Sequence, residues 1–322
     1  MTGRLSLLLL AALAAAFAAS VLLPFAPLSA LFWEDPELAS ALLVELRLPR
    51  ALLALAYGAT LGASGAAIQA LFANPLASPD LTGTTSGAAL GAVVTAYLFG
   101  FAAPIALSIG SVAGALGALA LLLALAGPKA ETATLLLSGL AISALAGALT
   151  TLALALAPSP FAFYDAYDWL MGSLIDRSLD QAAFAGLPAL ITIALLLRLG
   201  PALDRLALGE EVAQSLGHDV GRLRLKLVCL TAFGVGACVA ICGAIGFVGL
   251  VAPIFARRLT RGHPGRAILP AALIGGLLLI AADLTVRLAP LGRTLPIGVV
   301  TALIGAPFFL WLVAHMRWRL RA

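Results

Sequence analysis

The chain has 322 residues, of which 62% are hydrophobic and only 11% charged, with a formal net charge of +4. Soluble domains carry roughly 25% charged residues, so this composition excludes an ordinary soluble globular protein. The apolar residues gather in runs of roughly 20, the length that crosses about 30 Å of hydrocarbon. We therefore predict an all-α polytopic membrane protein, with a single transmembrane domain over residues 1–322.

The N-terminal segment, residues 1–30, has two interpretations. Arg4, an apolar core and a small-residue end are typical of a secretory signal. Signal cores run about 7–15 residues, however, and this core is longer. Its length favours a first membrane span.

Ten candidate spans follow from the apolar runs and the residues that interrupt them. They cover residues 5–28, 50–72, 82–101, 104–126, 132–156, 182–199, 223–242, 245–260, 267–286 and 295–314. The boundary between 223–242 and 245–260 is the weakest, because little more than Gly243 and Ala244 divides the two runs. An even number of spans places both termini on one side of the membrane.

Basic residues predict the orientation, because Lys and Arg prefer cytoplasmic loops. With the N-terminus inside, 14 of the 19 Lys and Arg residues fall in cytoplasmic segments and 5 fall outside. We therefore expect both termini in the cytoplasm. The longest cytoplasmic loop then covers about residues 200–222.

Residues 73–83 contain Asn74, Pro75, Pro79 and Asp80 and interrupt an apolar run. Irregular backbone is tolerated at membrane depth only where protein or water covers it. The segment is therefore either a cytoplasmic turn or part of the lining of a pathway.

Small residues recur within the predicted spans, as at Gly58 and Gly62, Gly110 and Gly114, and Gly139 and Gly147. Such residues let helices approach closely in lipid, which favours simple bundle packing. The alternative is that these contacts permit small rigid shifts between two states.

No metal site is expected. Cys238 and Cys242 share a helix face, but no His, Asp or Glu lies near them in the sequence, which favours a packing role. His218, His263 and His315 are far apart.

Residues 208–226 form a polar segment between two apolar runs. Gly209 and Gly217 are suited to begin and end a short helix. Glu210 and Glu211 fall in its first turn, where carboxylates are favourable. On the residues alone, this helix would lie on the lipid surface or bind a partner.

Asp283 and Arg287 are four residues apart on one predicted helix, so we expect them to pair. A structural ion pair is favoured over a proton relay. An ion-coupled secondary carrier, which needs a titrating group inside the bilayer, remains the alternative.

The chain has no G-x-x-x-x-G-K-[ST] motif, since its two lysines, Lys129 and Lys226, follow no such glycine pattern. It therefore cannot bind ATP phosphates by that route, and it shows no nucleophile–base pattern. We predict a transport subunit that is not an enzyme and that depends on a partner for energy.

Several segments together resemble the FecCD family, the membrane permeases of ATP-driven importers for iron-siderophores, haem and cobalamin. The matching stretches are RLPRALLAL (47–55), GASGAAIQALFANPLASP (62–79), WLMGSL (169–174), LALGEEVAQSLG (206–217), GAIGFVGLVAP (243–253), LPAALIGGLLLIAADLTVR (269–287) and LPIGVVTALIGAPFFLWL (295–312). The resemblance covers roughly residues 40–314.

The resemblance implies a homodimer, or a pair with a paralogous permease, in a bacterial inner membrane. It also implies two cytoplasmic ATPases, which use ATP and Mg, and an external or lipid-anchored substrate-binding protein. It implies no cofactor bound by this chain and no nucleic-acid partner. A ferric siderophore is the expected substrate, with haem or cobalamin as alternatives.

Roles for individual residues also follow from the resemblance. The ATPase-coupling segment comprises Gly209, Glu210, Glu211, Val212, Ala213, Leu216 and Gly217. Residues expected to contact the binding protein are Arg47, Arg50 and Arg287, and those expected near the inner gate are Asn74, Leu76 and Thr151. Trp169 and Gly172 match a short helix after the fifth span that shapes the outer mouth.

Three positions depart from the family pattern. Ile254 replaces a usual His, Thr294 a usual acid and Ala73 a frequent Arg. These differences bear on ATPase contacts and substrate range rather than on the fold.

Overall fold

The structure is a computed structural model, and it describes residues 2–100, 103–127, 132–288 and 295–319. Helices make up all the regular structure within these ranges. They are α1 (Thr2–Leu22), α2 (Phe25–Glu34), α3 (Pro36–Ala41), η1 (Leu42–Arg47), α4 (Leu48–Leu71), η2 (Pro79–Thr82), α5 (Thr84–Tyr97), α6 (Pro104–Ala126), α7 (Thr132–Ala155), α8 (Pro160–Leu170), α9 (Leu179–Leu206), α10 (Glu210–Ser215), α11 (Val220–Cys242), α12 (Val248–Leu259), α13 (Pro264–Leu288) and α14 (Ile297–Arg319). The predicted all-α class is confirmed.

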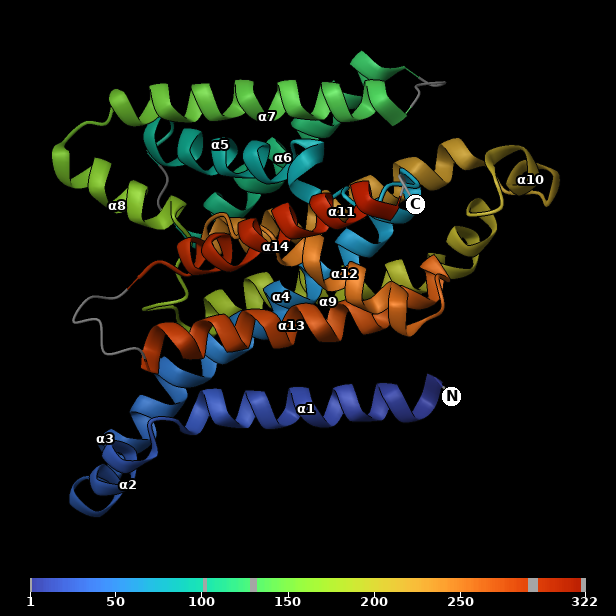
Figure 1. The fold of residues 1–322 in the computed structure, drawn as a ribbon. Coiled ribbons are helices and arrows are strands. Elements are labelled where there is room, and N and C mark those ends of the chain that lie inside the picture. The colour runs from blue at the N-terminus through green and yellow to red at the C-terminus, as the bar shows by residue number, and fades with distance from the viewer. Residues whose placement is uncertain (1, 101–102, 128–131, 289–294, 320–322) are drawn as a thin grey trace.

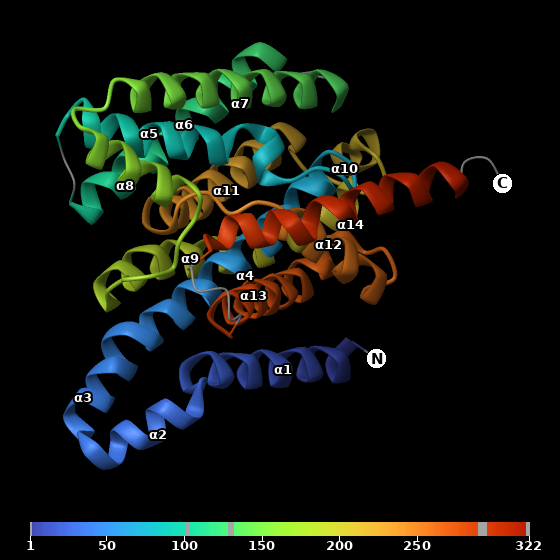
Figure 2. The same ribbon diagram turned by 60° about the vertical axis from the view of Figure 1, so that its left-hand side comes forward.

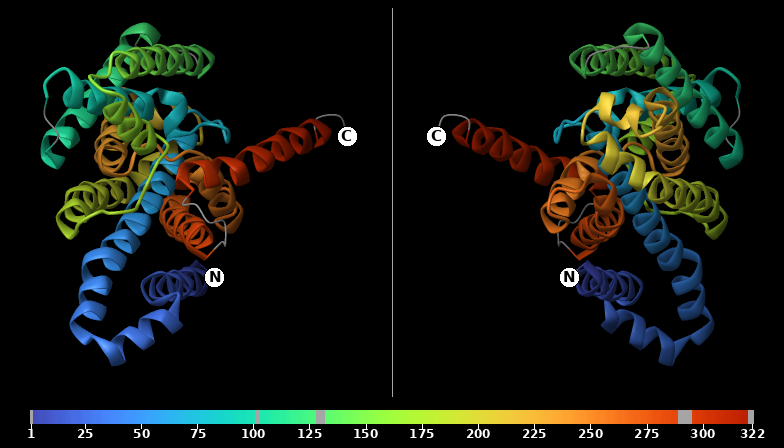
Figure 3. Two further views of the ribbon diagram at one scale, coloured as in Figure 1. Left: turned by 90° about the vertical axis from the view of Figure 1, so that its left-hand side faces the viewer. Right: turned by 90° about the vertical axis from the view of Figure 1, so that its right-hand side faces the viewer.

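The bundle is built around α4, which packs against α9, α11, α12 and α13. Helices α5, α6 and α7 form a further layer on the α11 side, and α1 lies against α13 at the opposite edge (Figure 1). The two end-on views in Figure 3 show the same order of layers.

Glycines set the closest helix contacts. A Cβ atom at Gly58 would lie 2.4 Å from the Gly275 carbonyl oxygen, and one at Gly62 would lie 2.0 Å from that of Ala271. A Cβ at Gly114 would lie 2.1 Å from the Gly87 carbonyl oxygen. Small residues therefore allow α4 to contact α13, and α5 to contact α6, backbone to backbone. A Cβ at Gly147, in contrast, would meet nothing within 4 Å in the described part of the chain.

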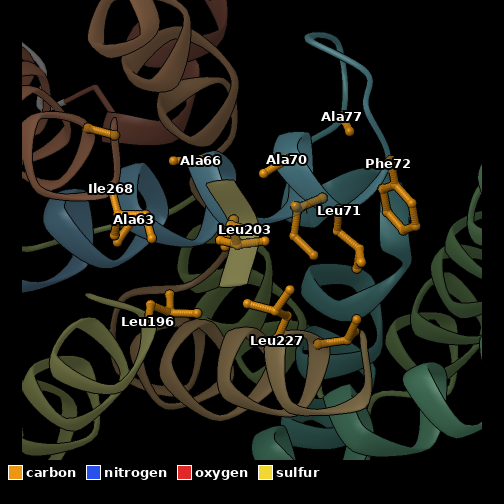
Figure 4. Packing of buried hydrophobic residues seen from close by; sticks show 14 of the residues in the cluster. Ala63, Ala66, Ala70, Leu71, Phe72, Ala77, Leu196, Leu203, Leu227 and Ile268 are labelled. Carbon is orange, nitrogen blue, oxygen red and sulfur yellow. The ribbon is translucent and has the colours of Figure 1, made fainter. Parts of the chain in front are cut away.

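The largest apolar cluster lies between α4, α9, α11 and α13 (Figure 4). Ala63 and Ala66 on α4 are fully or almost fully buried and face the larger side chains of its neighbours, including Leu196, Leu227 and Ile268. Cys238 and Cys242 are fully buried in a second cluster. Their position agrees with a packing role.

Each predicted span overlaps one main helix, although residues 5–28 also include the end of α1 and the start of α2, and the helices differ in length. Six stretches are long and apolar enough to cross a membrane within the described residues, and they include α4, α6, α7, α9, α11 and α13. The apolar parts of α1 and α14 are shorter, and α5 and α12 have only 14 and 12 residues. The division between the two least separable runs is confirmed, because α11 ends at Cys242 and α12 begins at Val248.

Three short helical segments, α2, α3 and η1, precede α4, and most of their residues lie between the first two predicted spans. Pro36 occupies the first turn of α3, and the Asp35 carboxylate accepts a hydrogen bond from the Leu38 amide at 3.0 Å. Figure 2 shows that α2 and α3 project beyond the ends of α1 and α4. Proline at the first turn and Asp at the N-cap are standard start signals, which the apolar-run criterion did not use.

The beginning of α1 and the end of α14 lie at the same end of the bundle as α10 (Figure 1). Helices α2, α3 and α8 lie at the other end. The common placement of the two ends is what an even number of crossings requires.

Candidate functional site

The short helix α10 has the boundaries that its glycines predicted. Gly209 is its N-cap residue, with φ of +110°, and Gly217 follows its last turn, with φ of +83°. Residues with a Cβ rarely adopt such backbone angles, so glycine allows the chain to turn sharply at both points. The Gly217 amide donates to the Gln214 carbonyl and the His218 amide donates to that of Ala213, which closes the helix.

The two faces of α10 differ in their surroundings. Ala213 is 1% exposed and packs into the main apolar cluster, so it faces the chain's own bundle. Leu208, Val212 and Leu216 are 65%, 42% and 55% exposed. Large apolar side chains that project from the end of a bundle are typical of a protein contact.

An ion pair fixes α10 to the start of α11. The Arg224 guanidinium lies 2.9 Å from the Glu210 carboxylate, and the Arg224 side chain is only 12% exposed. Arg205 and His218 are also in contact beside α10. The sequence analysis recognised the basic residues of this segment only as cytoplasmic charge, and the spacing of Glu210 and Arg224 gave no sign of their pairing.

Three arginines gather at the opposite end of the bundle, close to the end of α1. Arg47 donates to the carbonyls of Val21 and Leu22, at 3.2 and 3.0 Å. Arg287 donates to the carbonyls of Ser20 and Leu23. The last carbonyls of a helix lack partners within it and carry partial negative charge, so these arginines stabilise the end of α1.

The predicted pairing of Asp283 with Arg287 is wrong. Asp283, which is 1% exposed, instead accepts two hydrogen bonds from the Nε of Arg50, at 2.8 and 3.1 Å. The close approach of α4 and α13 brings Arg50 to the carboxylate, while α1 engages Arg287. Arg47, Arg50 and Arg287 thus form one partly buried cluster, and their contact with a binding protein stays a prediction.

The structure brings together two of the three residues expected at the inner gate. The Asn74 side-chain oxygen accepts a hydrogen bond from the Leu76 amide at 2.9 Å, and Leu76 packs beside Leu250 and Ile254. Thr151 is exposed on α7, four residues before the end that leads to α8, and donates to the Gly147 carbonyl. It therefore lies toward the end of the bundle that holds α8, away from Asn74 and Leu76.

Residues 73–83 first turn beyond α4 and then return into the bundle. Pro79 lies against Gly249, where a Cβ would be 3.0 Å from Pro79 Cδ and 3.1 Å from the carbonyl oxygen of Leu61, in the middle of α4. This part of the segment is therefore covered by protein, as backbone at membrane depth must be.

Trp169 and Gly172 lie where three elements meet. The Trp169 carbonyl oxygen occupies the space that a Cβ at Gly243 would need, at 1.8 Å. The Gly172 carbonyl accepts a hydrogen bond from the Ile297 amide at 3.0 Å. Trp169 belongs to α8, but this helix ends at Leu170, so Gly172 lies in the following turn rather than in the helix.

Two buried polar residues of α4 bond to the break between α11 and α12 and to the first turn of α12, and the sequence analysis missed them. The Tyr57 hydroxyl donates to the Gly243 carbonyl at 3.1 Å and accepts from the Ile245 amide at 3.3 Å. Gln69 donates to the Leu250 carbonyl at 3.2 Å. A tyrosine and a glutamine within an apolar span were the available signal, because buried polar groups need partners.

Comparison with known proteins identifies the family. Residues 6–315 match the FecCD transport family. The chain belongs to the FecCD transport family. It is 41% identical over 294 residues to the vitamin B12 import system permease protein BtuC of Vibrio cholerae, covering 88% of this chain and 85% of the relative. It is 39% identical over 269 residues to the Fe(3+)-citrate import system permease protein YfmE of Bacillus subtilis, covering 83% and 80%.

A solved structure agrees with this membership. The fold superimposes with a TM-score of 0.85 on a chain described as an inward-facing, metal-chelate type ABC transporter, at 31% identity and 98% and 99% coverage. As a FecCD protein, the chain is a permease of an ABC importer and a multi-pass protein of the bacterial inner membrane.

Two of the three departures from the FecCD pattern fall on described residues. Ile254 is 9% exposed and packs in a small cluster with Leu250 and Leu312. Ala73 is exposed at the turn after α4 and has φ of +46°. Thr294 lies outside the described residues.

Proposed function

We propose that this permease works as a pair of identical chains with two cytoplasmic ATPases and a substrate-binding protein, and that α10 is the ATPase contact. The observation that supports this proposal is the group of exposed apolar side chains at α10 and its flanks, Leu208, Val212 and Leu216, on a helix joined to α11 by the Arg224–Glu210 pair. In this arrangement the end with α10 and both termini faces the cytoplasm.

A rigid attachment suits a coupling role. Burial of a Val or Leu side chain contributes about 1.5–3 kcal/mol before ordering costs, so a few such residues can hold a partner. Ala213 anchors the inner face of α10, and Arg224 links its first turn to a long bundle helix. Movement of the ATPases would then tilt α11 with α10 and open the pathway to each side in turn. In this proposal the ATPases, and not the permease, bind ATP and Mg.

The proposed substrate is a metal chelate, either a ferric complex or cobalamin. Relatives of this chain are named for vitamin B12 import and for Fe(3+)-citrate import, and the structural neighbour is of metal-chelate type. The binding protein would make the selection, and the arginine cluster at its end of the bundle would lie near the docking surface.

The test is uptake by proteoliposomes that hold the permease, its ATPase and its binding protein, with cobalamin and a ferric chelate offered in parallel. We expect Leu216→Asp and Glu211→Lys to abolish ATP-driven uptake and ATPase co-purification, because each places an unfavourable charge at the contact. Glu37→Lys, an equally exposed charge reversal at the other end, should leave ATPase co-purification unchanged.

Two results would contradict the proposal. Retention of the ATPase by Leu216→Asp would show that α10 is not the contact. Uptake driven by an ion gradient in vesicles without nucleotide would instead identify an ion-coupled carrier.

A further inference from the structure

An apolar groove runs along the surface of the bundle between α4 and α9. It has a volume of about 480 Å³, with Leu52, Leu55 and Ala56 on the α4 side and Gly186, Leu190 and Ile193 on the α9 side. The two helices pack against each other, and Figure 3 shows α9 at the outer edge of the bundle. The groove is therefore open to the surrounding membrane.

Small residues create this groove. On α9, Ala182, Gly186 and Ala189 follow one another at helical spacing, and a Cβ at Gly186 would meet nothing within 4 Å. From Leu179 to Ile193 the helix rises about 21 Å, at 1.5 Å per residue. One leaflet supplies about 15 Å of hydrocarbon, half of the bilayer core. The groove is thus long enough to hold an extended acyl chain.

A polar pocket adjoins the groove at the end of the bundle that carries α2 and α3. It has a volume of about 350 Å³ and shares Leu179 with the groove. Glu45 lines it from η1, and Asp176 and Arg177 line it from the connection between α8 and α9. The apolar groove and the polar pocket therefore lie next to each other at Leu179, as the acyl chain and the headgroup of a lipid molecule do.

The charges of this pocket are not matched within the described part of the chain. The Nε atom of Arg177 is buried without a hydrogen-bond partner there. Glu45 and Asp176 take part in none of the ion pairs between described residues. One cation and two carboxylates face the same space, so the pocket complements a ligand that carries both a negative and a positive group.

We propose that the groove and pocket together bind one phospholipid with an ammonium headgroup, such as phosphatidylethanolamine. The acyl chain lies between α4 and α9, the phosphate accepts hydrogen bonds from Arg177, and the ammonium group lies near Glu45 and Asp176. Arginine matches phosphate geometry well, and hydrogen bonds between charged groups are the strong ones. A purely anionic headgroup would leave both carboxylates unpaired.

This site is separate from the import pathway proposed above and does not depend on the identity of the substrate. The lipid would fill the space between the central helix α4 and α9, which is the helix that leads into α10.

The test is native mass spectrometry of the full-length chain, extracted from nanodiscs with equal amounts of phosphatidylethanolamine and phosphatidylglycerol. We expect wild type to retain phosphatidylethanolamine preferentially. Gly186→Trp, which fills the groove, should lose this lipid. Gly117→Trp is the matched control, because a Cβ at Gly117 also meets nothing within 4 Å but the residue lies on α6.

Changes in the pocket should separate the headgroup contacts. Arg177→Gln should weaken retention about tenfold, the factor that corresponds to one hydrogen bond to a charged group. The double variant Glu45→Gln/Asp176→Asn should abolish the preference for phosphatidylethanolamine over phosphatidylglycerol.

Three results would overturn the proposal. They are equal retention by Gly186→Trp and Gly117→Trp, equal retention of the two lipids by wild type, and conversion of a dimer to a monomer by Gly186→Trp with lipid unchanged. The last would show that the groove is a contact between two copies of the chain.

Discussion

Asp283 is a buried acid whose partner comes from a distant part of the sequence. Its carboxylate is held by Arg50, 233 residues away, while Arg287 binds the end of α1. The sequence analysis selected Asp283 as an acid within a predicted span, and the family resemblance selected the three arginines. Helix spacing then paired Asp283 with Arg287 instead of Arg50. Helix spacing reveals which residues share a face, and it carries no information about which neighbouring helix will face them.

Breaking this pair should destabilise the protein strongly. Asp283→Leu leaves the largely buried Arg50 without a counter-charge, and such a loss costs about 3–5 kcal/mol. We expect a large fall in the thermal unfolding temperature in detergent micelles. The double variant Arg50→Met/Asp283→Leu should recover much of it, because no isolated charge remains.

A matched control is available in the pair of Arg222 and Asp219, whose side chains are 82% and 57% exposed. Exposed pairs contribute about 0–1 kcal/mol, so Arg222→Met should unfold close to wild type. If Asp283→Leu unfolds at the same temperature as Arg222→Met, the buried pair does not stabilise the bundle as inferred.

Among the elements, α4 shows best what sequence patterns can and cannot predict. Its existence, and its small residues as packing positions, followed from composition, and its place at the centre of the bundle emerged only in the structure. The apolar-run criterion also missed α3, which begins with a capping Asp35 and Pro36, and it did not separate α2 from the first span, although Pro24 precedes α2. Similarly, the glycines predicted both ends of α10, whereas its inward and outward faces depend on contacts with α9 and α11.

The contact between α4 and α13 should tolerate no added methyl group. In Gly62→Ala, the new Cβ would lie 2.0 Å from the Ala271 carbonyl oxygen, so the helices must separate. Overpacking costs typically about 1–3 kcal/mol, and we expect a loss of that size in thermal unfolding followed by tryptophan fluorescence.

Gly117→Ala is the control, since its Cβ would meet nothing within 4 Å. Alanine favours the helix by up to about 1 kcal/mol over glycine, so this variant should be as stable as wild type or more so. Equal destabilisation by both substitutions would contradict the inference, because the close contact present at Gly62 and absent at Gly117 would then not determine the cost.

For the whole molecule, the common placement of the helix ends fits an even number of crossings, and the distribution of Lys and Arg predicts that this end faces the cytoplasm. Exposed Trp33 on α2 and exposed Gln214 on α10 lie at opposite ends of the bundle. In this orientation, α2 faces the outside and α10 faces the cytoplasm.

This orientation can be tested with a membrane-impermeant maleimide on intact cells. In a Cys229→Ser background, with Cys238 and Cys242 fully buried, we expect Trp33→Cys to be labelled directly. Gln214→Cys should be labelled only after the cells are opened. Labelling of Gln214→Cys in intact cells would reverse the assignment of the two sides.

The short helix α10 lies between two glycines, Gly209 and Gly217. In the contacts described above, Ala213 and the Glu210–Arg224 pair join it to the rest of the bundle. The segment that contains α10 can therefore be exchanged as a unit. Residues 208–217 could be transplanted from a relative that uses a different ATPase, provided that the small inward residue and the acid opposite Arg224 are kept. If α10 is the ATPase contact, as proposed above, such a chimera would work with the ATPase of the relative while it kept its own substrate, so the two specificities could evolve separately.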